Sequence, residues 1–413
     1  MTAQLNGQKA APVSGAVSAP FAPPPARPTQ TGPLGLRYDF NYGARLLLPP
    51  GLWQVKITDD SDNLLYGCET GGGWVLGSKK YYLPFRLTVH EAGQLVLDHS
   101  LDLEGREVLV HFPPKVGLGD ALAWIGYVEK FQQKHQCRLE CVLRPDLVKL
   151  LVPQYPDLLL SAPGEVRTKE PYATYRLGLF FDDSQGDQQP LDFRQVGLSR
   201  TAAYILDLDP AEIRPRLHLK APRTIVEPYV CIAMQSTSQA KFWNNGGGWP
   251  GVIEYLQDLG YRVFCLDRDR NVGSGYVWNR IPQGVEDFTG DRPLQERVDI
   301  LRHADFFVGL SSGLSWLAWG AGIPVVLISG FTRPTCEFYT PYRVFNRFGC
   351  SGCWDDQVLR FDPEDFLWCP RHQGTARQFE CSRLITAQQV IGHIQRLMAD
   401  GGLVPPRVLK ASS

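Results

Sequence analysis

The stretch that decides the fold of this chain is FFVGLSSGLSWLAWGAGIPVVLISGF, residues 306–331. It contains no charged residue and exceeds the roughly 20 residues that a transmembrane helix needs. Five glycines, four serines and Pro324 nevertheless divide its apolar residues into two short blocks. We therefore predict a strand (305–310), a tight turn, a helix (313–320) and a second strand (324–329), in a soluble chain without a membrane span.

Outward from this stretch, strands and helices alternate in two series, and this alternation is typical of parallel sheets joined by right-handed crossovers. The series predict two Rossmann-like lobes, residues 107–222 and 223–345. Ligands of such sheets lie beyond the carboxyl ends of the strands, so we expect the site in the cleft between the lobes. The other predicted strands are 107–112, 138–143, 175–181, 229–235 and 262–266, and the other helices are 120–135, 146–152, 251–259 and 293–303.

The remaining segments differ in composition. Residues 1–35 are rich in proline and alanine, lack the pattern of a signal peptide and predict a disordered tail. Residues 36–106 read as a β-rich domain for assembly or acceptor recognition, with strands in 52–58, 80–90 and 94–99 and a hairpin turn at Ala92-Gly93. Residues 346–385 form a cysteine-rich segment, and 386–413 a final helix (386–400) and tail. The formal net charge of −1 gives no reason to expect nucleic acid as a partner, and without an export signal we expect a cytoplasmic protein.

Two loops of the predicted sheets carry candidate reactive groups. In the first, glycines precede Asp120 at a helix start, where its carboxylate could take a proton from an attacking hydroxyl or cap the helix, and the two roles can coexist. The second, residues 235–241, follows a strand and contains hydroxyls and Lys241, which suit a diphosphate. A solvated polar loop is the alternative for this second segment.

A third loop, residues 309–316, joins a strand to a helix. Free backbone N–H groups and the positive end of the helix dipole make such a turn a candidate anion site. Gly313 admits close approach of a phosphate and the neighbouring serines can donate hydrogen bonds. The pattern matches neither a dinucleotide-binding glycine motif nor a P-loop.

Four of the ten cysteines, Cys350, Cys353, Cys369 and Cys381, are spaced like the ligands of a metal knuckle. Four thiolates suit tetrahedral zinc or a single iron, and a closed shell of four ligands predicts a structural metal. His372 lies inside this segment, and we interpret it as a bystander.

These loops together resemble the ADP-heptose glycosyltransferases. The donor lobe resembles that family over residues 285–330, and Asp120 and Lys241 match its base and its phosphate-contacting lysine. Ser311 and Trp316 depart from the common heptosyltransferase pattern, which has an acidic residue and a histidine there. With the β-rich region and the cysteine segment, the chain after the tail resembles the bacterial autotransporter heptosyltransferases, which are protein O-heptosyltransferases.

This resemblance implies a GT-B fold and the inverting transfer of heptose from ADP-heptose to serine hydroxyls of an autotransporter adhesin passenger protein, with no metal at the reaction centre. Asp120 would be the general base and Lys241 would hold the diphosphate. The resemblance also implies one ferric ion on the four cysteines, with zinc as the alternative, and a homo-oligomer, a dodecamer. The implied donor-binding residues are Gly119, Thr237, Ser238, Phe288, Thr289, Gly290, Ser311, Ser312, Gly313, Leu314 and Ser315.

Two other functions fit parts of the sequence. A heptosyltransferase could act on a lipopolysaccharide core or another oligosaccharide. A non-enzymatic scaffold could use the cysteine segment for recognition, but it would leave Asp120 and Lys241 without a purpose.

Overall fold

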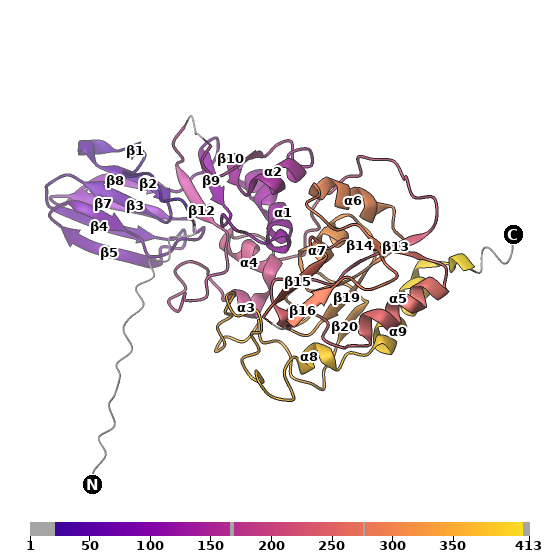
Figure 1. Ribbon diagram of the computed structural model, residues 1–413. Coiled ribbons are helices and arrows are strands. Elements are labelled where there is room, and N and C mark those ends of the chain that lie inside the picture. Colours follow the sequence, from indigo (N-terminus) through magenta and orange to yellow (C-terminus); the bar gives the residue numbers. More distant parts are fainter. Residues whose placement is uncertain (1–20, 166–168, 276, 408–413) are drawn as a thin grey trace, which may run out of the picture.

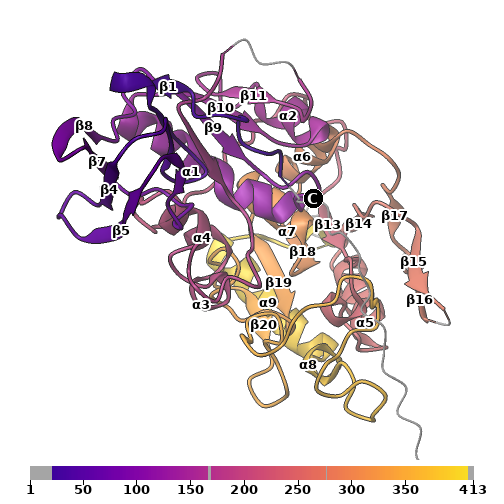
Figure 2. The same ribbon diagram turned by 90° about the vertical axis from the view of Figure 1, so that its left-hand side faces the viewer.

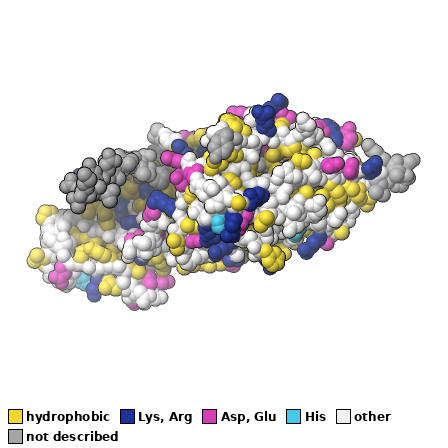
Figure 3. Space-filling model, turned by 60° about the horizontal axis from the view of Figure 1, so that its bottom comes forward, with side chains coloured by type: hydrophobic (Ala, Val, Ile, Leu, Met, Phe, Trp, Pro, Cys, Tyr) yellow, Lys and Arg dark blue, Asp and Glu magenta, His cyan; other side chains and the backbone are white. Residues whose placement is uncertain are grey.

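Two lobes, each built around a largely parallel sheet, lie side by side, and a smaller antiparallel sheet adjoins the first lobe (Figure 1). The structure is a computed structural model that describes residues 21–165, 169–275 and 277–407. On the face shown in Figure 3, acidic and basic side chains are interspersed among apolar ones, in keeping with the formal net charge of −1.

The C-terminal lobe has a six-stranded sheet, and every paired strand in it is parallel. Its spatial order is β17 (Glu286–Asp287), β14 (Arg262–Cys265), β13 (Tyr229–Ala233), β18 (Phe307–Leu310), β19 (Val325–Ser329) and β20 (Arg343–Phe345). In order along the chain these strands are third, second, first, fourth, fifth and sixth, which is the doubly wound Rossmann arrangement.

Alternation along buried strands explains why helices cover both faces of this sheet. In β13, Val230 and Ile232 join one apolar core, whereas Cys231 and Ala233 join the other. The first core contains α5 (Gly248–Asp258) and α9 (Ala387–Gly401), and the second contains α6 (Leu294–Arg302) and α7 (Gly313–Gly320). A strand buried on both faces is apolar throughout, as expected for parallel sheets.

The apolar stretch 306–331 forms β18, α7 and β19, so the predicted strand, helix and strand are confirmed. Helix α7 has only eight residues because it ends at Gly320 and because Gly322, two residues later, adopts a positive φ of 85°. Among the described residues, no helix is long and apolar enough to cross a membrane.

The first lobe has a sheet of eight strands, and its parallel half carries the predicted Rossmann-like pattern. Helices α1 (Leu118–His135) and α2 (Pro145–Leu151) connect its first three parallel strands, and α3 (Phe193–Val196) and α4 (Leu198–Ile205) follow β12. The spatial order is β11 (Leu159–Ser161), β10 (Arg138–Val142), β9 (Glu107–His111), β12 (Ala173–Arg176), β2 (Arg37–Asn41), β3 (Arg45–Leu48) and β6 (Gly73–Leu76), with β1 (Gln30–Thr31) paired to β2.

The region 36–106 is β-rich as expected, but its strands are divided between two sheets. Strands β2, β3 and β6 extend the sheet of the first lobe, because β2 pairs in parallel with β12. The others form an antiparallel sheet in the order β5 (Leu64–Thr70), β4 (Trp53–Thr58), β7 (Arg86–Glu91) and β8 (Gln94–Ser100). The hairpin at Ala92-Gly93 is confirmed, with positive φ angles of 47° and 81° that suit a tight two-residue turn.

The predicted disordered tail, residues 1–35, is only partly within the described structure, and its second half is ordered. Phe21 is buried, and Arg45 reaches the Pro25 carbonyl at 2.9 Å while pairing with the buried carboxylate of Asp39. The backbone N–H of Thr29 donates to the same carboxylate at 3.0 Å. Proline-rich backbone offers unpaired carbonyl groups, and here arginine side chains donate to them while Asp39 accepts from the Thr29 N–H, so composition alone misjudged this segment. Residues 1–20 lie outside the described structure.

Other element boundaries differ from the predictions in places where backbone pairing is not visible in local sequence. Strand β12 ends at Arg176 rather than at residue 181, and the run 80–90 forms a strand only from Arg86. A hairpin of β15 (Asn271–Ser274) and β16 (Val277–Arg280), which we did not predict, projects from the C-terminal lobe (Figure 2). The short elements are η1 (Pro33–Gly35), η2 (Gln239–Lys241) and α8 (Glu380–Arg383).

The two lobes touch where the first turns of α1 and α7 meet. A Cβ atom on Gly313 would lie 2.7 Å from Cβ of Leu118, and one on Gly119 would lie 2.8 Å from the Trp316 ring. Neither glycine is needed for its φ angle; each is needed for the close approach of the helices.

We expect Gly313→Ala to lower the free energy of unfolding by about 1–3 kcal/mol, because the methyl group overpacks a rigid contact. Gly392→Ala is the matched control: it lies in α9 with no atom within 4 Å of the added Cβ, and it should stabilise by about 0.5–1 kcal/mol. Urea unfolding of both variants checks this. Equal stability of Gly313→Ala and the parent would show that the helix contact is not tight.

Candidate active site

A cavity of about 640 Å³ lies between the lobes, at the carboxyl ends of the strands where the strand order of both sheets reverses. The reversal falls between β9 and β12 in the first lobe and between β13 and β18 in the second. The loops that follow β9, β13 and β18 line the cavity, so the sheet topology brings the three predicted loops together. The predicted residues on its wall are Gly119, Asp120, Thr237, Lys241, Ser311, Ser312, Gly313 and Leu314.

Asp120 lies in the first turn of α1, part-buried on the cavity wall. Its Oδ2 accepts a hydrogen bond of 3.3 Å from the backbone N–H of Gly117, so the carboxylate caps the helix while facing the cavity. Burial raises the pKa of Asp120, against opposing effects of the Lys241 charge, the Gly117 hydrogen bond and the Arg144 charge. A raised pKa makes this carboxylate a stronger proton acceptor than an exposed aspartate.

Lys241 ends η2, the short helix that follows β13, and it lies across the cavity from the first lobe. Burial lowers the pKa of its ammonium group, and the negative charge of Asp120 opposes this shift. A part-buried cation in the same cavity as a carboxylate gives the site one group for a proton and another for an anion.

The turn after β18 presents hydroxyl groups and the N-terminus of α7. Ser311 donates a hydrogen bond to the Glu337 carboxylate, and Oγ of Ser312, the N-cap residue, is buried without a hydrogen-bond partner among the described residues. A buried hydroxyl without a partner at a helix N-terminus is a donor available to an anionic ligand.

Five of the expected donor-binding residues are not on the cavity wall. Ser315 is buried and donates to the Leu310 carbonyl at 2.5 Å, and Ser238 is buried beside the Phe366 carbonyl. These two hydroxyls are used to hold their own loops. The other three, Phe288, Thr289 and Gly290, form a turn in which Thr289 bonds Asp287 and the Gly290 carbonyl accepts from Arg297.

Two buried carboxylates on the cavity wall were missed by the sequence analysis. Asp267 accepts hydrogen bonds from the backbone N–H groups of Met234, at 2.9 Å, and Gln235, at 3.1 Å, and thereby fixes the start of the Lys241 loop. Burial raises the pKa of Asp267 to about 6. Its place directly after strand β14 is a signal that could have identified it.

The second missed carboxylate, Glu337, stands beside Ser311, where the common heptosyltransferase pattern has an acidic residue. It accepts from Ser311 and from Thr332, and it pairs with Arg343 at 2.6 Å. Glu337 thus brings a carboxylate to this part of the cavity from a later position in the chain. No local sequence pattern could reveal this contact.

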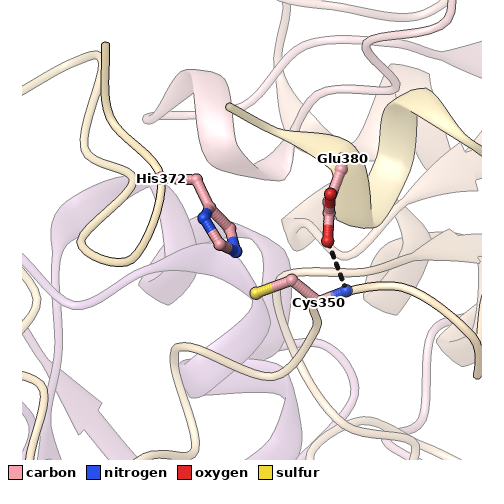
Figure 4. A group of neighbouring side chains, drawn as sticks. All are labelled: Cys350, His372 and Glu380. Carbon is pink, nitrogen blue, oxygen red and sulfur yellow. Dashed lines mark hydrogen bonds between the residues drawn. The ribbon is translucent and has the colours of Figure 1, made fainter. Parts of the chain in front are cut away.

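In the cysteine-rich segment, the candidate metal donors that lie within 4.8 Å of one another among the described residues include one of the four predicted cysteines, Cys350, together with a histidine and a glutamate. Burial and the neighbouring thiols raise the pKa of Cys353 and of Cys381 to about 12. Sγ of Cys350, a ring nitrogen of His372 and a carboxylate oxygen of Glu380 lie within 4.8 Å of one another (Figure 4). Crowded thiols favour the protonated form unless a cation offsets their charge, so this donor set suits a metal ion. His372, interpreted as a bystander, is one of these donors.

Two Rossmann-like lobes, with a cavity between them that is lined by a carboxylate from one lobe and a lysine from the other, form a GT-B-like fold. Family models agree: glycosyltransferase TibC, N-terminal domain, matches residues 32–93, and glycosyltransferase family 9 (heptosyltransferase) matches residues 177–349. The chain belongs to the autotransporter heptosyltransferases.

Two relatives and one solved structure carry this assignment. The autotransporter heptosyltransferase BAHTCr of Citrobacter rodentium is 59% identical over 92% of this chain and 93% of its own. TibC of Escherichia coli H10407 is 58% identical over 91% of this chain and 93% of its own. The crystal structure of TibC, a dodecameric iron-containing heptosyltransferase in complex with ADP-D-β-D-heptose, superimposes with a TM-score of 0.89 over 92% of this chain and all of that one. A further relative, BimC of Burkholderia thailandensis, is described as an inactive autotransporter heptosyltransferase. It is 42% identical over 90% of this chain and 88% of its own.

Proposed function

We propose that this protein transfers heptose from ADP-heptose to serine hydroxyl groups of an autotransporter adhesin passenger protein. The observation that carries the proposal is that Asp120 and Lys241, from different lobes, line one cavity together with the N-terminus of α7. The ADP-heptose complex of TibC, at 58% identity, supports the choice of donor.

The proposed reaction is a single displacement. Asp120 accepts the proton of the serine hydroxyl as its oxygen forms a bond to the anomeric carbon. The bond from that carbon to the diphosphate breaks on the opposite face, and ADP leaves with the electron pair. One displacement inverts the configuration at the anomeric carbon, and no metal ion is needed at the reaction centre.

The groups proposed to bind ADP-heptose are of two kinds, positively charged groups and neutral hydroxyls. Lys241 and the first N–H groups of α7 offset the negative charge that develops on the departing diphosphate. Hydroxyls of Thr237 and Ser312 supply further hydrogen bonds, since both residues line the cavity and Oγ of Ser312 is without a partner among the described residues. Phe288, Thr289, Gly290, Ser238 and Ser315 then act by shaping the loops rather than by direct contact.

For the cysteine segment we propose a structural iron site on Cys350, Cys353, Cys369 and Cys381, with zinc as the alternative. The electrostatic effect of the neighbouring thiols on the pKa of Cys353 and of Cys381, and the iron-containing structure of TibC, support it. We propose a ferric ion as the metal and a dodecamer as the assembly, again from likeness to TibC. We also propose that the protein acts in the cytoplasm, where ADP-heptose and an unexported passenger protein would meet.

The double variant Cys350→Ser/Cys353→Ser should lose its metal and more than about 3 kcal/mol of stability, because metal binding is coupled to folding of the segment. Elemental analysis and thermal unfolding measure both effects, and Cys68→Ser, in β5, is the matched control. Full metal content in the double variant would reject these ligands. An equal loss of metal in His372→Ala would assign His372 to the coordination shell.

The test of the function is co-expression with an adhesin passenger protein, followed by mass spectrometry of its peptides. We expect modified serines that carry the mass of one heptose residue, and only when the transferase is present. Heptose found on lipid A–core instead would favour the oligosaccharide acceptor. No turnover of ADP-heptose with either acceptor would favour a scaffold, a real alternative in a family that includes an inactive relative.

A further inference from the structure

The ammonium group of Lys241 lies against a group of three aromatic rings. Its Nζ is 5.3 Å from the ring centroids of Phe331 and Trp354 and 5.8 Å from that of Phe361. These distances are within the range of cation–π attraction. No ion pair or hydrogen bond of the Lys241 side chain is seen among the described residues, so the three rings are an important part of what surrounds its ammonium group.

The three rings form one packed unit that belongs largely to the cysteine-rich segment. Their centroids are 5.3 to 5.7 Å apart, and the backbone N–H of Trp354 donates to the Phe331 carbonyl at 3.2 Å. Trp354 directly follows Cys353, which packs on the same cluster. The aromatic platform (Phe331, Trp354 and Phe361) is therefore continuous with Cys353 of the cysteine-rich segment.

The same segment also holds the backbone of the Lys241 loop. The N–H of Gln239 donates to the Phe366 carbonyl at 2.8 Å, and the buried Ser238 hydroxyl lies 3.5 Å from that oxygen. A loop that begins at β13 in the core of the C-terminal lobe is thus anchored at its far end on residues of the cysteine-rich segment.

We propose that the cysteine-rich segment positions Lys241 for the donor diphosphate, with Trp354 and Phe361 as the positioning residues. The inference rests on the proposed function, because it assigns Lys241 to the diphosphate. A lysine side chain has four rotatable carbon–carbon bonds, and aromatic faces restrict its ammonium without neutralising the charge. The segment thereby acquires a role at the reaction centre although its thiols do not line the cavity.

Phe361 gives the cleaner test, because it is not among the residues that line the cavity, whereas Trp354 is. We expect Phe361→Leu and Trp354→Leu to weaken ADP binding, measured by titration calorimetry, by on the order of tenfold. Trp354→Phe should restore most of the affinity, since it keeps an aromatic face. Phe348→Leu, a fully exposed site in the same segment, is the matched control and should bind ADP like the parent.

A double-mutant cycle with Lys241→Met separates positioning from independent contact. If the platform acts through Lys241, adding Phe361→Leu or Trp354→Leu to Lys241→Met causes no further loss of ADP affinity. Fully additive losses, or parental affinity in both leucine variants, would overturn the proposal, as would equal impairment of Trp354→Phe and Trp354→Leu. Elemental analysis should find the metal retained in each variant. If the parent binds ADP but transfers no heptose, the proposed function fails, while the cycle still decides whether the platform positions Lys241.

Discussion

Asp120→Asn is expected to reduce heptose transfer by on the order of 1000-fold while ADP-heptose still binds, because general base catalysis contributes roughly 100- to 10,000-fold. The amide is nearly isosteric, and its oxygen can still accept from the Gly117 N–H, so the start of α1 should be preserved. Initial rates with a passenger acceptor and calorimetric titration with ADP measure the two effects separately.

The stability of the same variant gives an independent check. Burial raises the pKa of Asp120, so in the folded state its ionised form is disfavoured relative to the unfolded chain. That penalty is present above the folded-state pKa and disappears below the pKa of the unfolded chain. At neutral pH Asp120→Asn should therefore be at least as stable as the parent. Glu296→Gln, the same change in the first turn of α6, is the control. Near-parental turnover by Asp120→Asn would reject the assignment of the base.

The parts of the fold that were predictable are those encoded by local patterns. The uncharged stretch 306–331 predicts β18, α7 and β19 because Gly313 and Gly322 mark the turns between apolar blocks. Alternation of strand and helix then places the loops after β9, β13 and β18 at one edge of two parallel sheets. Asp120 and Lys241 were found for the same reason: each follows a predicted strand at that edge.

Features that depend on contacts distant in sequence were not predictable. Strand β2 joins the first lobe by pairing with β12, more than a hundred residues away, and the segment from Phe21 is held by Arg45 and Asp39. In the site, Ser311 donates a hydrogen bond to Glu337, although the whole of α7 and β19 separates the two residues in the sequence. None of these pairs leaves a periodic signal, since each residue is ordinary in its local context.

The cysteine-rich segment is another example of a contact that local sequence does not reveal. Cysteine spacing indicated a metal, but it gave no sign that Trp354 and Phe361 of the same segment face Lys241. From sequence alone, aromatic residues near a predicted metal knuckle are interpreted as the hydrophobic core of that knuckle. Their contact with a lysine on another loop is visible only in three dimensions.

Lys241→Met is the second variant for which we expect a large effect, a loss of about 100- to 1000-fold in kcat/KM for ADP-heptose. Methionine keeps an unbranched apolar side chain against the aromatic platform but cannot offset charge on the leaving diphosphate. Removing a single electrostatic donor from a transition state costs an effect of this size. The loss should appear in kcat as well as in KM, because the charge on the diphosphate is greatest as the bond breaks. Lys149→Met, at an exposed position of α2, is the control.

The pH profile connects the two residues and discriminates an electrostatic role from a structural one. Burial raises the pKa of Asp120 and the charge of Lys241 lowers it, so loss of that charge should raise this pKa further. The acidic limb of the kcat/KM profile requires ionised Asp120, and it should therefore move to higher pH in Lys241→Met. In the parent, burial lowers the pKa of Lys241, so activity should begin to fall on the basic side below the pH at which an exposed lysine titrates. If the acidic limb stays in place while the rate falls, Lys241 does not share an electrostatic field with the base, and its contribution would be confined to the shape of the loop.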